Sequence, residues 1–381
     1  MTSHKPRQSN KENFPVTCLS TIFGIRPARL CKTLWIGYIY MLIVIILYYV
    51  LFYSTMDYAK ELYNIMECVS FTAIRVRKIS TIFNIFFLPL MIISSAINFN
   101  KVRNSRLDLN ELDQKLQLFN SNIYCAKSMW KNSLYVCGIL LFTNIMGLAE
   151  YYNLKNANSN YMYNLMWLSN IFPQIVNSVA ISGFVVIVAD VTRRYQLMNE
   201  IILDLRVIKK EVSALSQDVN NVFQFKLLKQ CYVIFSNIII KINEAYGFII
   251  LLTIIICCFG MCAHLLVVVQ TFGDKSYLVD FTIDLLWTFF YFGKLAYIVN
   301  ICHHFQLEGK RASKILHEYK VDSDNHLLKQ ESESFAHQVR NVDVQITACN
   351  FFNIDYPLLC KVVLGMTAYV FFLSQFTRRT Q

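Results

Sequence analysis

The final apolar stretch of the chain, residues 349–376, reads CNFFNIDYPLLCKVVLGMTAYVFFLSQF. Proline is tolerated in the first turn of a helix, and Asp355 stands where it can cap one, so we predict a helix over 356–376 that begins around Pro357. Its apolar run is long enough to cross a membrane and ends on Gln375. Polar side chains at membrane depth are costly and usually face a cavity or another helix. This last helix is therefore a candidate lining for a water-filled path.

The rest of the chain is equally apolar. Of its 381 residues, 55% are apolar and only 16% are charged, whereas soluble domains carry about 25% charged residues. We predict an all-α, polytopic membrane protein with seven transmembrane helices, at 34–53, 79–98, 132–152, 163–189, 245–270, 278–302 and 356–376. An odd number of crossings places the two termini on opposite sides of the membrane.

Positive charge is distributed unevenly between the two sides. Of the 36 Lys and Arg residues, 26 lie in the four segments on the side of the N-terminus and 8 in the four opposite segments. The positive-inside rule therefore predicts a cytoplasmic N-terminus and an extracellular C-terminus. Membrane orientation also accounts for the net charge of +11 without a nucleic-acid partner.

This topology divides the chain into four parts. They are a cytoplasmic N-terminal segment (1–33), helices one to six with cytoplasmic helical loops (34–302), a cytoplasmic helical anchor segment (303–355), and the last helix with a short external tail (356–381).

The anchor segment carries a heptad-like stripe. Apolar residues recur there in steps of four and three: Phe335, Val339, Val342, Ile346 and Cys349. We predict a helix that ends near Cys349 and packs against extensions of the membrane helices. The alternative is an amphipathic helix lying on the membrane surface.

A candidate ligand site lies on the sixth predicted span. Asp280, Asp284, Trp287 and Tyr291 step by four, three and four, so they share one helix face in the outer half of the membrane. Two carboxylates beside an indole suit a cationic or hydroxyl-rich small molecule. The structural alternative is that Asp280 is interfacial and Asp284 makes a bundle contact. Other residues predicted to join the site are Glu150, Tyr151, Trp167 and Gln174.

Other polar residues favour structural roles. Lys294 is interpreted as a snorkelling or paired structural charge. Cys257, Cys258, Cys262 and His264 lie in an apolar helix where cysteine behaves as a small apolar residue, so no metal site is predicted. We found no Gly-rich phosphate loop, nucleophile elbow or metalloprotease motif, and expect neither enzyme activity nor a cofactor.

The C-terminal motif resembles that of the insect gustatory receptor family, within the insect chemoreceptor superfamily. That family ends in Thr-Tyr, five apolar residues and Gln-Phe, and this chain shows Tyr369, five residues, then Gln375-Phe376. The segment FNIDYPLL at 352–359 is also similar to the family's lead-in to its last helix. The chain departs from the pattern at Ala368, where the family has threonine, and at Ser374, where a bulky apolar residue is usual.

The resemblance implies a tetrameric, ligand-gated, nonselective cation channel in the plasma membrane of a sensory dendrite. Its partners would be a small-molecule tastant, the lipid bilayer and other gustatory receptor subunits in a homo- or heterotetramer. The last helix would line the pore, with Gln375 and Phe376 at the gate. Helical spacing adds Leu364, Ala368 and Phe371 to the stripe of Gln375.

Two further features of the sequence concern the type of receptor and the lining of its pore. Sugar-sensing members often carry an acidic residue inside the terminal motif, and none lies between Tyr369 and Gln375, which favours a bitter-type or divergent receptor. Cations on the axis would repel permeant cations, so we expect Lys361, Arg378 and Arg379 to point away from the pore.

Two alternative receptor classes stay open at this point. An odorant receptor of the same superfamily would share the fold. A G-protein-coupled receptor also has seven spans, but its charge bias is the reverse, and no Asp-Arg-Tyr triplet follows the third span here.

Overall fold

In the computed structural model we describe residues 14–27, 34–65, 71–119, 137–138, 141–149, 152, 161–211, 215–272, 278–317, 326–342 and 344–378. Nearly all of them are helical, which confirms the all-α prediction. The elements are α1 (Phe14–Ile22), α2 (Leu34–Ile65), α3 (Phe71–Gln117), α5 (Tyr161–Glu211), α6 (Leu215–Thr271), α7 (Leu278–His317), α8 (His326–Asn341), β1 (Thr347–Ala348), β2 (Phe352–Asn353) and α9 (Tyr356–Arg378).

Six of the described helices are long and apolar enough to cross a membrane: α2, α3, α5, α6, α7 and α9. Each covers one predicted window. Of the remaining window, 132–152, residues 137–138, 141–149 and 152 are described, and all of them are helical.

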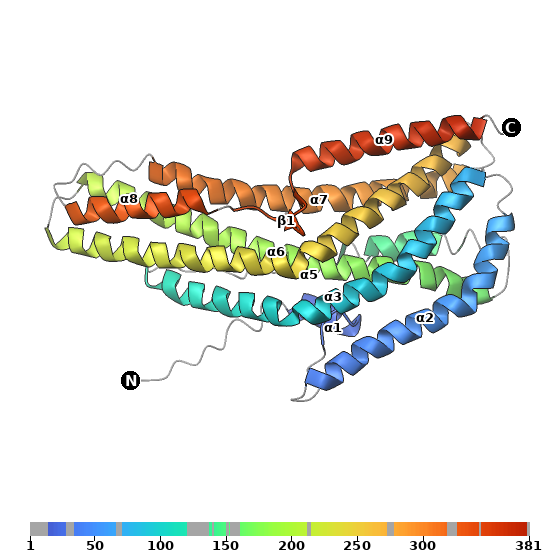
Figure 1. Ribbon diagram of the computed structural model, residues 1–381, viewed down its shortest axis with the longest axis horizontal. Coiled ribbons are helices and arrows are strands. Elements are labelled where there is room, and N and C mark those ends of the chain that lie inside the picture. The colour runs from blue at the N-terminus through green and yellow to red at the C-terminus, as the bar shows by residue number, and fades with distance from the viewer. Residues whose placement is uncertain are drawn as a thin grey trace.

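The membrane helices continue well past their apolar windows. α3, α5, α6 and α7 extend side by side into the left half of the molecule in Figure 1, where α8 joins them. α8 packs against α6 and α7, with Phe335 and Val339 buried. The predicted packing of internal helices is therefore confirmed for α8, and the surface-helix alternative is wrong for it.

The prediction that this helix continues to Cys349 is also wrong. α8 ends at Asn341, and a short hairpin of β1 and β2 follows, with Ala348 opposite Phe352. Every second residue is buried here, namely Val344, Ile346 and Ala348. This is the period of a strand and not that of the predicted heptad. Cys349 and Asn350 close the turn in the left-handed region, at φ 51° and 61°.

α9 begins immediately after this hairpin. The carboxylate of Asp355 accepts a hydrogen bond from the Leu358 amide at 3.0 Å, so the predicted N-terminal cap is confirmed. In Figure 1, α9 runs along one edge of the molecule, in contact with α6, α7 and α3.

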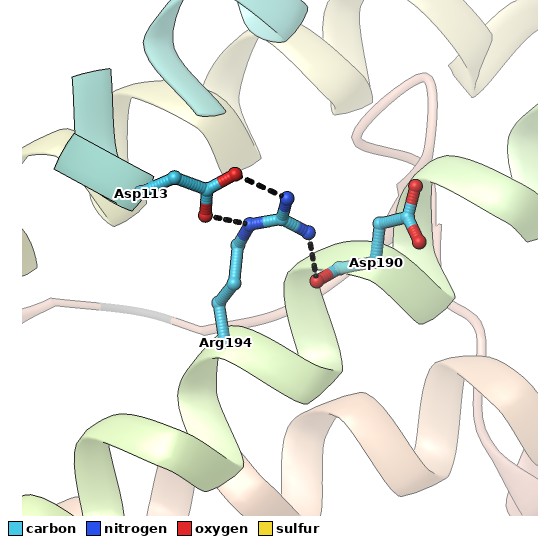
Figure 2. Close-up of polar contacts among 3 residues, drawn as sticks. All are labelled: Asp113, Asp190 and Arg194. Atoms are coloured by element: carbon cyan, nitrogen blue, oxygen red, sulfur yellow. Dashed lines mark hydrogen bonds and ion pairs between the residues drawn. The ribbon is translucent and has the colours of Figure 1, made fainter. Parts of the chain in front are cut away.

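A buried ion pair fastens the helical extensions together. The Arg194 guanidinium (α5) donates two hydrogen bonds to the carboxylate of Asp113 (α3), at 2.6 and 2.7 Å. A third, at 2.8 Å, goes to the backbone carbonyl of Asp190 (Figure 2). Bidentate geometry of this kind fixes orientation as well as distance.

Candidate functional site

α9 is almost uncovered by the rest of the protomer. Only 6% of its most apolar window is buried, against 83% for that of α5. Its contacts with the bundle follow one stripe, which we call the bundle stripe. It consists of Val362, Met366, Val370 and Leu373.

The predicted pore residues lie on the opposite side of α9. Successive helical residues are about 100° apart, so Leu364, Ala368, Phe371 and Gln375 form a stripe roughly 180° from the bundle stripe. We call it the open stripe. All four residues are exposed, Phe371 by 65%.

The structure describes the last residues of the chain only in part. Phe376 and Arg378 belong to α9, but their side chains lie outside the described set, as does all of Arg379. Lys361 is exposed and, by helical angle, lies on the side of the open stripe. The expectation that it points away from a pore axis stays a prediction.

Two glycines leave room for the connector, residues 344–355, which leads into α9. A Cβ atom at Gly247 (α6) would lie 2.9 Å from the backbone nitrogen of Cys349, and one at Gly309 (α7) would lie 2.4 Å from Val344. The connector therefore lies directly on the backbones of α6 and α7. Asn243 strengthens this contact, because its side chain hydrogen-bonds the backbone at Gln345 and Thr347.

The predicted acidic face of α7 is a buried contact with α6. The Asp284 carboxylate lies 2.6 Å from Nδ1 of His264, and both side chains are largely enclosed. The imidazole stacks on Trp287 and Tyr291, with ring centroids 5.8 Å apart in each case. A Cβ at Gly260 would lie 2.6 Å from the Tyr291 ring, so this glycine lets the helices approach.

The other predicted ligand residues do not join this cluster. Asp280 is partly exposed near the start of α7. On α5, Trp167 packs against Gly147, and the side-chain amide of Gln174 donates to Asn84 (α3) at 3.3 Å. Glu150 and Tyr151 lie outside the described residues.

A second polar cluster surrounds Lys294 on α7. Its buried ammonium donates to the side-chain oxygen of Asn177 and, at 3.2 Å, to the hydroxyl of Ser178, both on α5. The Asn177 amide in turn donates to the Thr253 hydroxyl (α6) at 2.8 Å and approaches the sulfur of Met91 (α3) at 3.2 Å. Four helices thus meet at one network, which we call the Lys294 hub.

A cavity of about 380 Å³ adjoins the hub on the flank of α7. It lies between α7 and the residues Gly138 and Phe142, and the rings of Phe142 and Phe290 stack with their centroids 5.3 Å apart. Its lining consists of Gly138, Phe142, Leu286, Phe289, Phe290, Gly293 and Lys294. None of the predicted ligand residues lines it.

The sequence carries a signal for each of the two clusters. α6 ends at Thr271 and α7 begins at Leu278, and His264 and Asp284 lie at similar distances along the chain from these two helix ends. For the hub, the signal was a lysine within an apolar helix facing Asn177-Ser178. Among the described residues, no group of three or more His, Cys, Asp or Glu is placed to hold a metal ion.

Comparison with known proteins identifies the family. A family model described as 7tm chemosensory receptor matches residues 15–378. Two Drosophila melanogaster proteins show partial similarity. They are the gustatory receptor for sugar taste 43a (23% identity, covering 36% of this chain and 32% of that protein) and the gustatory receptor for bitter taste 66a (30% identity, covering 23% and 17%). The chain thus spans a third or less of the length of these relatives.

Solved structures show the same fold. The olfactory receptor OR5 of Machilis hrabei superimposes with a TM-score of 0.67 at 12% identity, covering 96% of this chain and 98% of the receptor. Its complex with eugenol gives 0.63 at 13% identity, with the same coverage. These matches show the fold, and the family model, which spans nearly the whole sequence, shows that the chain belongs to the 7tm chemosensory receptor family, which is not a class of enzymes.

Proposed function

We propose that this chain is a gustatory receptor of the plasma membrane that forms a tetrameric, ligand-gated, nonselective cation channel. It has seven spans, a cytoplasmic N-terminus and an external C-terminus. The observation that carries the proposal is the open stripe of α9, which the protomer leaves uncovered and which ends on an amide.

Contact with lipid alone would leave one polar group of the open stripe without hydrogen bonds. Leu364, Ala368 and Phe371 tolerate lipid, but the Gln375 amide placed in hydrocarbon loses its hydrogen bonds to water. Copies of α9 around an axis would give the amide either water or a neighbouring subunit. The bundle stripe is occupied within the protomer, so the open stripe is the face available to other copies.

The stripe also has the chemistry of a gate. A ring of Phe371 side chains excludes water when the helices are close together, and a ring of amide oxygens at Gln375 can replace part of an ion's hydration shell when they separate. Phe376 completes the gate by resemblance to the family. Ligand binding opens such a gate only if the ligand binds the open arrangement more tightly.

A tastant is the proposed ligand. The partial relatives carry names for sugar taste and bitter taste, and the missing acidic residue between Tyr369 and Gln375 favours the bitter type. The predicted ligand face of Asp280, Asp284, Trp287 and Tyr291 remains a proposal, with Glu150, Tyr151, Trp167 and Gln174 as its extension. The buried pair with His264 means that a ligand at Asp284 must displace or share that imidazole.

The pore assignment is tested by cysteine substitution along α9. Cells expressing only this chain are screened with sugars, alkaloids and amino acids until a current is found. A charged thiol reagent is then applied to Ala368→Cys, Phe371→Cys and Gln375→Cys, with Met366→Cys on the bundle stripe as the matched control and the unmodified chain as the background. We expect the reagent to block the current only in the three open-stripe variants. Separately, we expect Gln375→Ala to alter conduction or resting leak. Equal effects at Met366, or none anywhere, contradict the assignment.

The ligand face is tested separately. Asp284→Ala is expected to shift the dose response of the activating compound, and Lys310→Met, an exposed change on the same helix, is expected to leave it unchanged. An unshifted response in Asp284→Ala removes this contact from the proposal.

An olfactory receptor is the second candidate, because the two matching structures described above are those of an olfactory receptor. Activation by volatile compounds but by none of the non-volatile tastants would favour it. Currents that require an added G protein would instead contradict the channel proposal itself.

A further inference from the structure

The Lys294 ammonium is a buried cation, and the residues that the structure describes provide no counter-ion for it. The residue is only 4% exposed, and its neighbours Asn177 and Ser178 are neutral. Across the described part of the chain, no carboxylate contacts it. Neutral hydrogen bonds offset only part of the cost of burying a charge, so an ionisable residue in an apolar helix is a functional candidate by default.

Several helices together position this cation. The Lys294 hub holds the ammonium against α5, and through Asn177 it holds α5 to Thr253 on α6 and Met91 on α3. A lysine ammonium has three N–H donors, of which the hub uses two. The Phe290 ring, which also lines the adjoining cavity, has its centroid 5.8 Å from Nζ. One N–H donor therefore remains for another polar group.

The cavity beside the hub supplies the space for that group. All of its lining residues except Lys294 are apolar or glycine, and it opens at Phe289 and Gly293, which are exposed on the flank of α7. Its volume of about 380 Å³ lies in the range of roughly 300–1,000 Å³ typical of small-molecule sites. An open apolar cavity with one cation among its lining residues favours an amphiphile with a single negative end.

We propose that this cavity binds a lipophilic carboxylic acid, whose carboxylate pairs with Lys294 while its apolar tail lies against Phe142, Leu286 and Phe289. The inference rests on the proposed receptor function in that such an acid would be an activating ligand. It differs from the ligand expected at Asp284, which is cationic or hydroxyl-rich. A small acid fits better than a phospholipid, because a two-chain lipid exceeds the volume of the cavity.

The hub also offers a route from this ligand to the pore. Thr253 belongs to α6, and α6 contacts α9 further along, where Cys262 and Met366 approach to 3.4 Å. An acid that draws the ammonium toward the cavity would weaken its bonds to Asn177. Because Asn177 also bonds Thr253, the weakened bond would alter the contact between α5 and α6, the helix against which α9 packs.

The test measures binding directly, so that it does not depend on channel activity. The full-length receptor is purified in phosphatidylcholine nanodiscs, and binding of radiolabelled decanoate is compared with that of decanol, which has the same tail and no charge. Lys294→Met removes the cation at similar length, and Lys294→Arg retains it. Lys310→Met, on the exposed side of α7, is the matched control.

We expect decanoate to bind the unmodified receptor and to bind Lys294→Met about 10- to 100-fold more weakly, the usual range for losing a hydrogen bond to a charged group. Decanol binding should change less than about threefold, and Lys310→Met should resemble the unmodified chain. If Lys294→Met elutes as a single folded species and still binds decanoate normally, or if decanol loses as much affinity, the proposal is overturned.

Gly293→Leu decides the matter if Lys294→Met fails to fold. A Cβ at Gly293 meets nothing within 4 Å, so the leucine enters the cavity without an internal clash. We expect it to reduce decanoate binding at least tenfold, and normal binding would overturn the proposal. Displacement of decanoate by phosphatidylglycerol added to the nanodiscs would also overturn it, by assigning the site to a lipid headgroup.

The same measurements separate this inference from the proposed function. Decanoate binding that depends on Lys294, without any current, supports the site and contradicts the channel. Currents evoked by other compounds, without decanoate binding, support the channel and contradict the site.

Discussion

Loss of the Arg194 guanidinium should destabilise the helical extensions strongly, whereas loss of both members of the pair should not. In Arg194→Met, the Asp113 carboxylate keeps its charge and loses two charge-assisted hydrogen bonds of 2.6 and 2.7 Å. Breaking a buried pair costs about 3–5 kcal/mol, and an exposed pair about 0–1 kcal/mol. The side chains are 8% and 22% exposed, so we expect about 2–4 kcal/mol.

The double variant Arg194→Met/Asp113→Leu removes the stranded charge as well. Apolar replacement of a whole buried ion pair is often close to neutral, so we expect it to recover most of the lost stability. Arg194→Lys should be intermediate, because lysine keeps the charge but lacks the planar fork. The contrast between single and double variants therefore distinguishes a stranded charge from lost packing.

The assay is thermal unfolding of the detergent-purified receptor, followed by fluorescence-detected size exclusion after heating. The exposed pair Lys101–Glu244, at 2.9 Å with side chains 44% and 52% exposed, provides the control, and Lys101→Met should shift the midpoint little. An Arg194→Met midpoint equal to that of the unmodified receptor would refute the reasoning. A double variant that is less stable than Arg194→Met would also refute it, because removal of the stranded carboxylate should restore stability.

Three glycine substitutions test the helix contacts. Gly247→Val should push the connector off α6 and impair gating or surface expression, because even its Cβ lies 2.9 Å from the Cys349 backbone; currents and cell-surface labelling measure both. Gly260→Ala should lower the thermal midpoint despite the better helix propensity of alanine, since its Cβ would lie 2.6 Å from the Tyr291 ring. Gly365→Ala on α9 meets nothing within 4 Å in the protomer and should be neutral or slightly stabilising by up to about 1 kcal/mol in the unassembled protomer. A stabilised Gly260→Ala or an unaffected Gly247→Val would contradict the close contacts on which these expectations depend.

Much of the architecture was determined by the sequence alone. Apolar runs of membrane length predicted six helices that the structure contains, because backbone satisfaction in hydrocarbon leaves little choice but a helix. The cap at Asp355 and the proline after it fixed where α9 begins. The terminal motif pointed to the family that the comparison found.

The anchor segment shows where local pattern was insufficient. Its apolar spacing satisfied a heptad across the end of α8, yet Val344 and Ile346 belong to an extended segment. The reason lies in contacts with other helices, since Gly247 and Gly309 provide the surface on which that segment packs. A stripe of apolar residues does not reveal which partner surface will cover it.

Only the tertiary structure decided how the polar residues are used. Helical spacing placed Asp284, Trp287 and Tyr291 on one face, but the packing of α6 gave that face to His264. The same packing left Lys294 beside a cavity without an acidic partner among the described residues. Sequence fixes which side chains share a helix face because backbone geometry is local, whereas the partner of each face depends on how distant helices meet, and that is set by the shape of the whole bundle.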